Sequence, residues 1–91
     1  MKKYIIERDL PGAGKLTKKE LREISDTSIQ MVGQLDKPYQ WLETYVTNNK
    51  LFCIHIAPDE ETIREHSKRA GFPIGSIREI TTIIDPSTSK I

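Results

Sequence analysis

The sequence predicts an α+β fold, a single domain over residues 1–91 in which an antiparallel sheet packs against two helices. Three observations predict it. Strand-like runs at residues 40–46 and 51–57 flank Asn48-Asn49, amphipathic segments of helical period lie on either side of this hairpin, and further strand-like runs lie near both ends. The order is β-α-β-β-α-β, which is typical of a ferredoxin-like sheet with both helices on one face.

The first half of the chain gives a strand, a loop and a helix. Residues 3–8 are the expected first strand, and residues 10–14 form a loop rich in glycine and proline. Thr17-Lys18-Lys19-Glu20 fits a capping box with Thr17 as the N-cap. A helix ending near Gly33 is predicted by an apolar stripe at three- and four-residue steps: Leu21, Ile24, Ser28, Met31 and Leu35.

The hairpin has no polar face. Asn48 and Asn49 tolerate positive φ, so we predict a two-residue primed turn, which sets Thr44 opposite Cys53 and Trp41 opposite Ile56. A half-exposed antiparallel sheet would alternate apolar and polar side chains. Both faces therefore need a cover, and we expect the helices on one and a second copy of the chain on the other, in a homodimeric α+β barrel. The two faces carry Leu42, Thr44, Val46, Leu51, Cys53, His55 and Ala57, and Trp41, Glu43, Tyr45, Phe52, Ile54 and Ile56.

The second helix is marked by charge at both ends. Asp59, Glu60 and Glu61 lie at its positive end, and Lys68 and Arg69 lie in its last turn, before a glycine suited to the left-handed stop. Its inward stripe is Ile63, His66, Ser67 and Ala70. Residues 76–85 are the predicted last strand, followed by a polar tail from Pro86.

Composition excludes several classes of function. Fourteen basic and thirteen acidic residues nearly cancel and no basic run occurs, so no nucleic-acid partner is expected. No apolar run approaches membrane-spanning length, and the first residues do not form a signal peptide. Cys53 is the only cysteine, so no intrachain disulfide is expected, and the protein is expected in the cytoplasm.

One short motif invites a phosphate-loop interpretation. Gly12-Ala13-Gly14-Lys15 lacks two elements of that loop, because Asp9 stands at the first glycine position and Leu16 follows the lysine. We predict a structural turn.

His66 is the most suggestive polar residue, since helical period places it on the inward face. Two interpretations stay open: a core histidine bonded to a carbonyl or water, or a site residue. Cys53 and His55 share a strand face roughly 6.5–7 Å apart, within reach of that helix. A thiolate and two imidazoles suit nickel, copper or zinc. The candidate metal ligands are His66, Cys53 and His55, and the candidate pocket residues are His66, Cys53 and Thr44; no catalytic residue is assigned.

Several segments together resemble a family of small bacterial ferredoxin-like proteins labelled nickel-binding. The matching pieces are residues 6–14, Trp41 with residues 44–47, residues 57–61, residues 64–66 and residues 71–73. The resemblance implies a ferredoxin-like homodimer and a nickel ion as the cofactor. Thr44 stands where the family often has serine, and His55 stands where an aromatic residue is more usual.

The expected function is non-catalytic binding of a divalent metal, nickel by resemblance, for sequestration or buffering. The alternative is a small-molecule-binding α+β barrel enzyme, of the cofactor-free oxygenase or isomerase type. Its pocket would lie at His66, with that imidazole as a general base. A plain interaction module is a third alternative.

Overall fold

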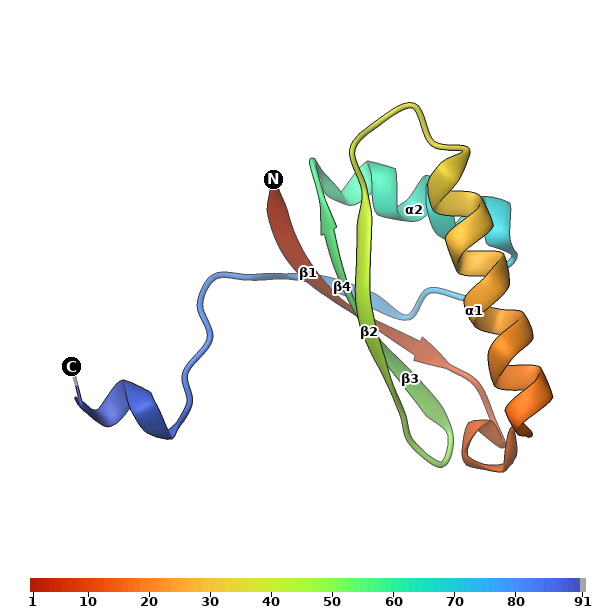
Figure 1. The fold of residues 1–91 in the computed structure, drawn as a ribbon, viewed down its shortest axis with the longest axis horizontal. Coiled ribbons are helices and arrows are strands. Elements are labelled where there is room, and N and C mark those ends of the chain that lie inside the picture. The colour runs from red at the N-terminus through yellow and green to blue at the C-terminus, as the bar shows by residue number, and fades with distance from the viewer. Residues whose placement is uncertain (91) are drawn as a thin grey trace.

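The structure, a computed structural model, describes residues 1–90 and confirms the predicted element order. The four strands form one antiparallel sheet in the order β2-β3-β1-β4, and both helices lie on one side of it (Figure 1). The elements are β1 (Lys2–Asp9), the short 3-10 turn η1 (Ala13–Lys15), α1 (Lys18–Gly33), β2 (Gln40–Val46), β3 (Lys50–Ala57), α2 (Glu60–Ala70), β4 (Ser76–Ile80) and the 3-10 segment η2 (Pro86–Lys90). Neither helix in this range has the length and apolar character that a membrane crossing needs.

Both helices begin and end where the sequence predicts. The Thr17 hydroxyl accepts from the Glu20 amide at 3.1 Å, and the Glu20 carboxylate accepts from the Thr17 amide at 3.0 Å. At the start of α2, the Asp59 carboxylate accepts from the Thr62 amide at 2.8 Å. Gly71 ends α2 with φ of 75°, the left-handed conformation that glycine adopts without strain.

The capping box at α1 gives a direct test of the helix boundary. Thr17→Ala should lower the free energy of unfolding by about 0.5–2 kcal/mol, because one amide of the first turn loses its acceptor. Urea denaturation measures the change. Thr27→Ala is the control, since that hydroxyl donates only to the Glu23 carbonyl one turn earlier, and its effect should be small. Equal stabilities of Thr17→Ala and the unmodified chain would contradict the capping role.

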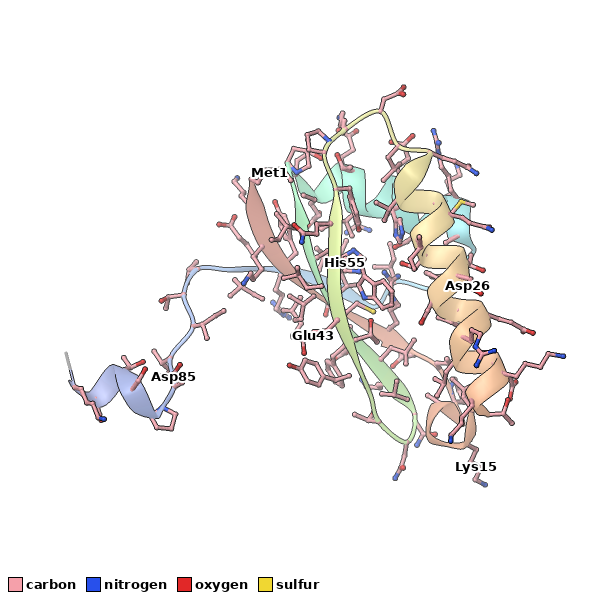
Figure 2. The ribbon with its side chains drawn as sticks, in the orientation of Figure 1. Met1, Lys15, Asp26, Glu43, His55 and Asp85 are labelled. Atoms are coloured by element: carbon pink, nitrogen blue, oxygen red, sulfur yellow. The ribbon has the colours of Figure 1, made fainter. Side chains whose placement is uncertain are left out.

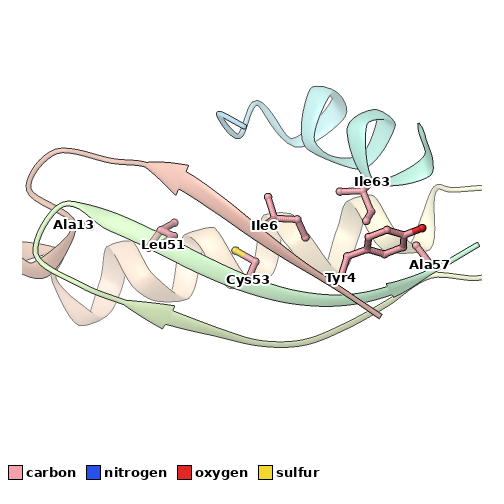
Figure 3. Close-up of a cluster of buried hydrophobic side chains, with 7 residues drawn as sticks. All are labelled: Tyr4, Ile6, Ala13, Leu51, Cys53, Ala57 and Ile63. Carbon is pink, nitrogen blue, oxygen red and sulfur yellow. The ribbon is translucent and has the colours of Figure 1, made fainter. Parts of the chain in front are cut away.

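The hydrophobic core lies mainly beneath α2. Tyr4, Ile6 and Cys53 project from the sheet toward Ile63 of α2 (Figure 3), and Ile6 and Ile63 are both fully buried. Helix α1, by contrast, contributes Ser28 as its one buried residue. The apolar stripe of α1 therefore faces the sheet without packing closely against it, and space remains between the helix and the sheet.

The predicted primed turn of the hairpin is wrong. No residue other than glycine has positive φ within residues 1–90. The Thr47 side chain closes the turn instead, because its hydroxyl accepts from the Lys50 amide at 3.1 Å and donates to the Lys50 carbonyl at 3.0 Å. A side chain that bonds the backbone two or three residues away replaces the left-handed residues of a primed turn.

The glycine-rich loop packs against this turn, as a structural element. The Gly14 amide donates to the Asn48 carbonyl at 3.1 Å, and the Leu10 amide donates to the Asn49 carbonyl at 2.9 Å. A Cβ at Gly14 would lie 3.0 Å from the Asn48 Cα, a backbone atom, so this close approach favours glycine. This contact confirms the structural interpretation of the loop.

A β-bulge corrects the predicted register at the far end of the hairpin. The pairing shifts between Trp41 and Glu43, so that Trp41 lies opposite His55 and not opposite Ile56. One extra residue reverses the alternation of every side chain beyond it. The predicted grouping of Trp41 with Tyr45 and Phe52 on one face is therefore wrong, and its indole lies on the other face, which meets the helices.

The predicted last strand is too long. Strand β4 ends at Ile80, which pairs with Lys3 near the start of β1, so the following residues have no partner strand. Residues 81–85 leave the sheet and extend away from the helices (Figure 1). The expected polar tail from Pro86 forms η2, supported by an Asp85 carboxylate that accepts from the Ser87 amide at 2.8 Å.

The outer face of the sheet keeps the apolar character that the sequence predicts. Ile5, Phe52, Ile54 and Ile56 are only partly buried there. We expect a second copy of the chain to cover this face, since large apolar surfaces are typical of obligate homodimers. Analytical ultracentrifugation at micromolar concentration should give twice the chain mass of 10.4 kDa.

A charge on the outer face should break this dimer. Ile54→Lys is expected to give a folded monomer, because it places an ammonium group at the apolar contact. Ile29→Lys, on an exposed position of α1, should leave the dimer intact. A monomeric unmodified chain would contradict the prediction.

Candidate functional site

A cavity of about 380 Å³ lies between α1 and the inner face of the sheet. The apolar stripe of α1 forms one side of this cavity, and most of the side chains around the cavity are apolar. The bulge in β2 adds an indole to its wall. The lining residues are Arg8, Leu10, Leu21, Ile24, Ser25, Ser28, Trp41, Thr44, Val46, Leu51, Cys53, His55, His66, Gly71, Phe72 and Pro73.

A cluster of three rings forms the polar end of the site: Tyr39, His55 and His66. The Tyr39 and His66 rings stack, with centroids 4.8 Å apart and planes at 18°. The His55 ring meets both edge-on, at 5.2 Å from Tyr39 and 5.5 Å from His66. Figure 2 labels His55 near the middle of the molecule, and both histidines are almost fully buried.

The hydrogen bond between Tyr39 and His55 sets the tautomer of the imidazole. The Tyr39 hydroxyl lies 2.5 Å from His55 Nδ1, and burial raises the pKa of Tyr39, so the phenol stays protonated and donates. Burial, with smaller contributions from His66 and Arg8, lowers the pKa of His55 to about 3. His55 is therefore neutral, with Nδ1 accepting and the proton on Nε2.

His66 is neutral too, but only one of its two ring nitrogens has a hydrogen-bond partner among residues 1–90. Nε2 lies 3.4 Å from the Ser28 carbonyl, which can only accept, so Nε2 carries the proton. Burial is the main cause of the lowered pKa of His66. Nδ1 then presents a buried lone pair, and it has no hydrogen-bond partner among the residues described. The core-histidine interpretation accounts for one of the two ring nitrogens.

Arg8 is the buried cation of the site. Its side chain is almost completely buried at the end of β1, where Nη1 donates to Ser67 Oγ at 2.9 Å and to the Pro73 carbonyl at 2.8 Å. Nε lies 3.5 Å from Cys53 Sγ, and the guanidinium lies 5.6 Å from the centre of the Phe72 ring. Strand alternation after Tyr4 and Ile6 could have predicted its inward position.

Residues 4–80 match a protein-family model described as "Nickel responsive protein SCO4226-like". The chain belongs to this family. A solved structure described as the crystal structure analysis of SCO4226 from Streptomyces coelicolor A3(2) superposes with a TM-score of 0.77. That likeness covers 90% of this chain and 99% of the other at 14% identity, and it confirms the ferredoxin-like fold. No curated protein matches the chain.

In this SCO4226-like chain, the predicted site residues line the same cavity. His66, Cys53, His55 and Thr44 all line the cavity, and Thr44 lies opposite Cys53 as predicted. The residues that the sequence analysis missed are Arg8 and Tyr39. The adjacent acids, Glu7 and Asp9, pair with a lysine of β3 on the sheet's other side.

The predicted donors do not form a nickel centre as they stand. No group of three or more His, Cys, Asp or Glu side chains within residues 1–90 is placed to hold a metal ion. The Arg8 guanidinium lies against Cys53, and a buried cation there would repel a divalent ion in a medium of low dielectric constant. The ligand roles of His66, Cys53 and His55 stay predictions.

Proposed function

We propose that this chain is a small-molecule binding protein whose ligand occupies the cavity beneath α1. The observation that carries the proposal is the cavity itself, whose volume of about 380 Å³ falls in the range of about 300–1,000 Å³ that ligand pockets have. Its apolar walls meet a few convergent polar groups at one end, which is the usual composition of such pockets.

A hydrogen-bonding group without a partner in the described residues lies in the polar end of the site. The lone pair on His66 Nδ1 is a buried acceptor without a partner, and such a group costs about 1–3 kcal/mol when it stays unpaired. A ligand donor would remove this cost. The proposal is one of binding, and the role of His66 as a general base in an isomerase or oxygenase stays a prediction.

Trp41 provides a built-in test, because it is the only tryptophan of the chain and lines the cavity. Its fluorescence should change on titration with octanoate, octanamide, cyclohexanecarboxylate or cyclohexanecarboxamide, none of which absorbs with tryptophan. Ser25→Phe should abolish the response by filling the space beneath α1. Gln30→Phe, at an exposed position of the same helix, is the matched control. No response to any of the four compounds would overturn the proposal.

The family description favours a second function, which is nickel binding for sequestration or buffering. Its support in the site is the free lone pair of His66 Nδ1, since a neutral imidazole nitrogen is a good nickel ligand. Nickel should then raise the melting temperature of the untagged protein, and His66→Ala should remove the increase. An unchanged increase in His66→Ala would assign the nickel response to exposed carboxylates and not to the cavity.

A further inference from the structure

We infer that the cavity binds an organic anion, with a carboxylate on the guanidinium of Arg8 and an apolar body against α1 and Trp41. This inference rests on the proposed function and names the chemical class of its ligand.

The first observation is a buried positive charge without a negative partner. Arg8 is 1% exposed, and none of the ion pairs formed within residues 1–90 includes it. Its contacts are a hydroxyl, a carbonyl, a sulfur atom and an aromatic face, none of which is a carboxylate. Buried charges in proteins are normally paired, because desolvation of an isolated ion is costly. The missing partner is the group that a ligand can supply.

The second observation concerns the geometry of the guanidinium. Ser67 and Pro73 take both hydrogen bonds of Nη1, and Nε is directed to Cys53. Nη2 has no acceptor in the described part of the chain. Two fixed contacts hold the planar group in place, and a pre-positioned guanidinium is well suited to a carboxylate. Because Arg8 lines the cavity, this recognition would take place inside it.

The other charges of the site agree with an anionic ligand. Both imidazoles are neutral, so they add no competing charge, and the phenol of Tyr39 is protonated. The nearest acids along the chain, Glu7 and Asp9, belong to the opposite face of the sheet, where they pair with Lys50. The cavity wall therefore carries a net positive charge, which favours an anion and disfavours a cation.

The remaining walls select an apolar body. Leu21 and Ile24 of α1 face Trp41 and Val46 of β2 across the cavity. A ligand with a carboxylate at one end and an aliphatic or alicyclic body would satisfy Arg8 and displace poorly bound water from the apolar walls.

Two pairs of ligands, each a carboxylate and its amide, test whether the ligand must be negatively charged, and the protein itself is unchanged. Octanoate should bind at least about tenfold more tightly than octanamide, and cyclohexanecarboxylate more tightly than its amide, since only the carboxylate neutralises the buried charge of Arg8. Trp41 fluorescence and isothermal titration calorimetry report both affinities. Equal affinities within each pair would overturn the anion inference and leave the cavity function standing. Absence of binding by all four compounds would overturn both.

Variants of Arg8 test whether its guanidinium is the group that binds the carboxylate. Arg8→Gln should lower the affinity for octanoate to that for octanamide, while the affinity for octanamide stays unchanged. Arg8→Lys keeps the charge but loses the Nη2 donor that the planar guanidinium holds in place, and it should bind octanoate with intermediate affinity. An Arg8→Gln protein that still prefers octanoate would overturn the assignment to Arg8. If Arg8→Gln does not fold, the comparison of Arg8→Lys with the unmodified chain decides, because unchanged octanoate affinity would contradict a contact through Arg8 Nη2.

Discussion

Ile63→Ala should lower the free energy of unfolding by about 2–5 kcal/mol, the cost of emptying a fully buried aliphatic site. Ile63 is 0% exposed and contacts the sheet residues of the core directly beneath α2 (Figure 3). It also lies one turn before His66, so a cavity at this position should loosen the helix that holds the imidazole. Denaturation with urea measures the loss, and a decrease of less than about 1 kcal/mol in the free energy of unfolding would contradict the assigned core.

The matched control for Ile63→Ala is Ile29→Ala. Both positions lie within helices, so the gain in helix propensity from isoleucine to alanine is the same in the two variants. Ile29 is 61% exposed on α1, and its replacement removes little buried surface. Its stability should stay within about 0.5 kcal/mol of the unmodified chain.

Acidification from pH 7 to pH 4.5 should remove about 2–3 kcal/mol of stability through His55 alone. Burial lowers the pKa of His55 from 6.5 to about 3 in the folded protein. Between these values the unfolded chain binds a proton that the folded chain excludes, so the stability present above pH 6.5 is lost as the pH falls toward 3. The lowered pKa of His66 acts in the same direction.

The variant His55→Gln isolates this contribution. Glutamine offers an amide oxygen to the Tyr39 hydroxyl but does not titrate, so the pH dependence between 6.5 and 4.5 should become shallower. Chemical denaturation at several pH values compares the two proteins. The same pH dependence in both would show that His55 is protonated in the folded state and would contradict the buried neutral tautomer.

The sequence determined the features that depend on residues close together in the chain. Thr17 and Glu20 cap α1 as their spacing predicts, Asp59 caps α2, and Gly71 ends it with positive φ. The element order, the family and the inward position of His66 also followed from local patterns, because caps and periodicities are set within one or two turns.

Only the tertiary structure decided the composition of the site. One bulged residue moved Trp41 to the inner face, and the start of β1 at Lys2 limited the length of β4. The isolation of Arg8 is visible only when the elements around its guanidinium are assembled, since its contacts come from residues 45 to 65 positions away in the chain. The cavity has the same origin, because the distance between α1 and the sheet depends on the packing of all the elements together and not on the pattern of any one of them.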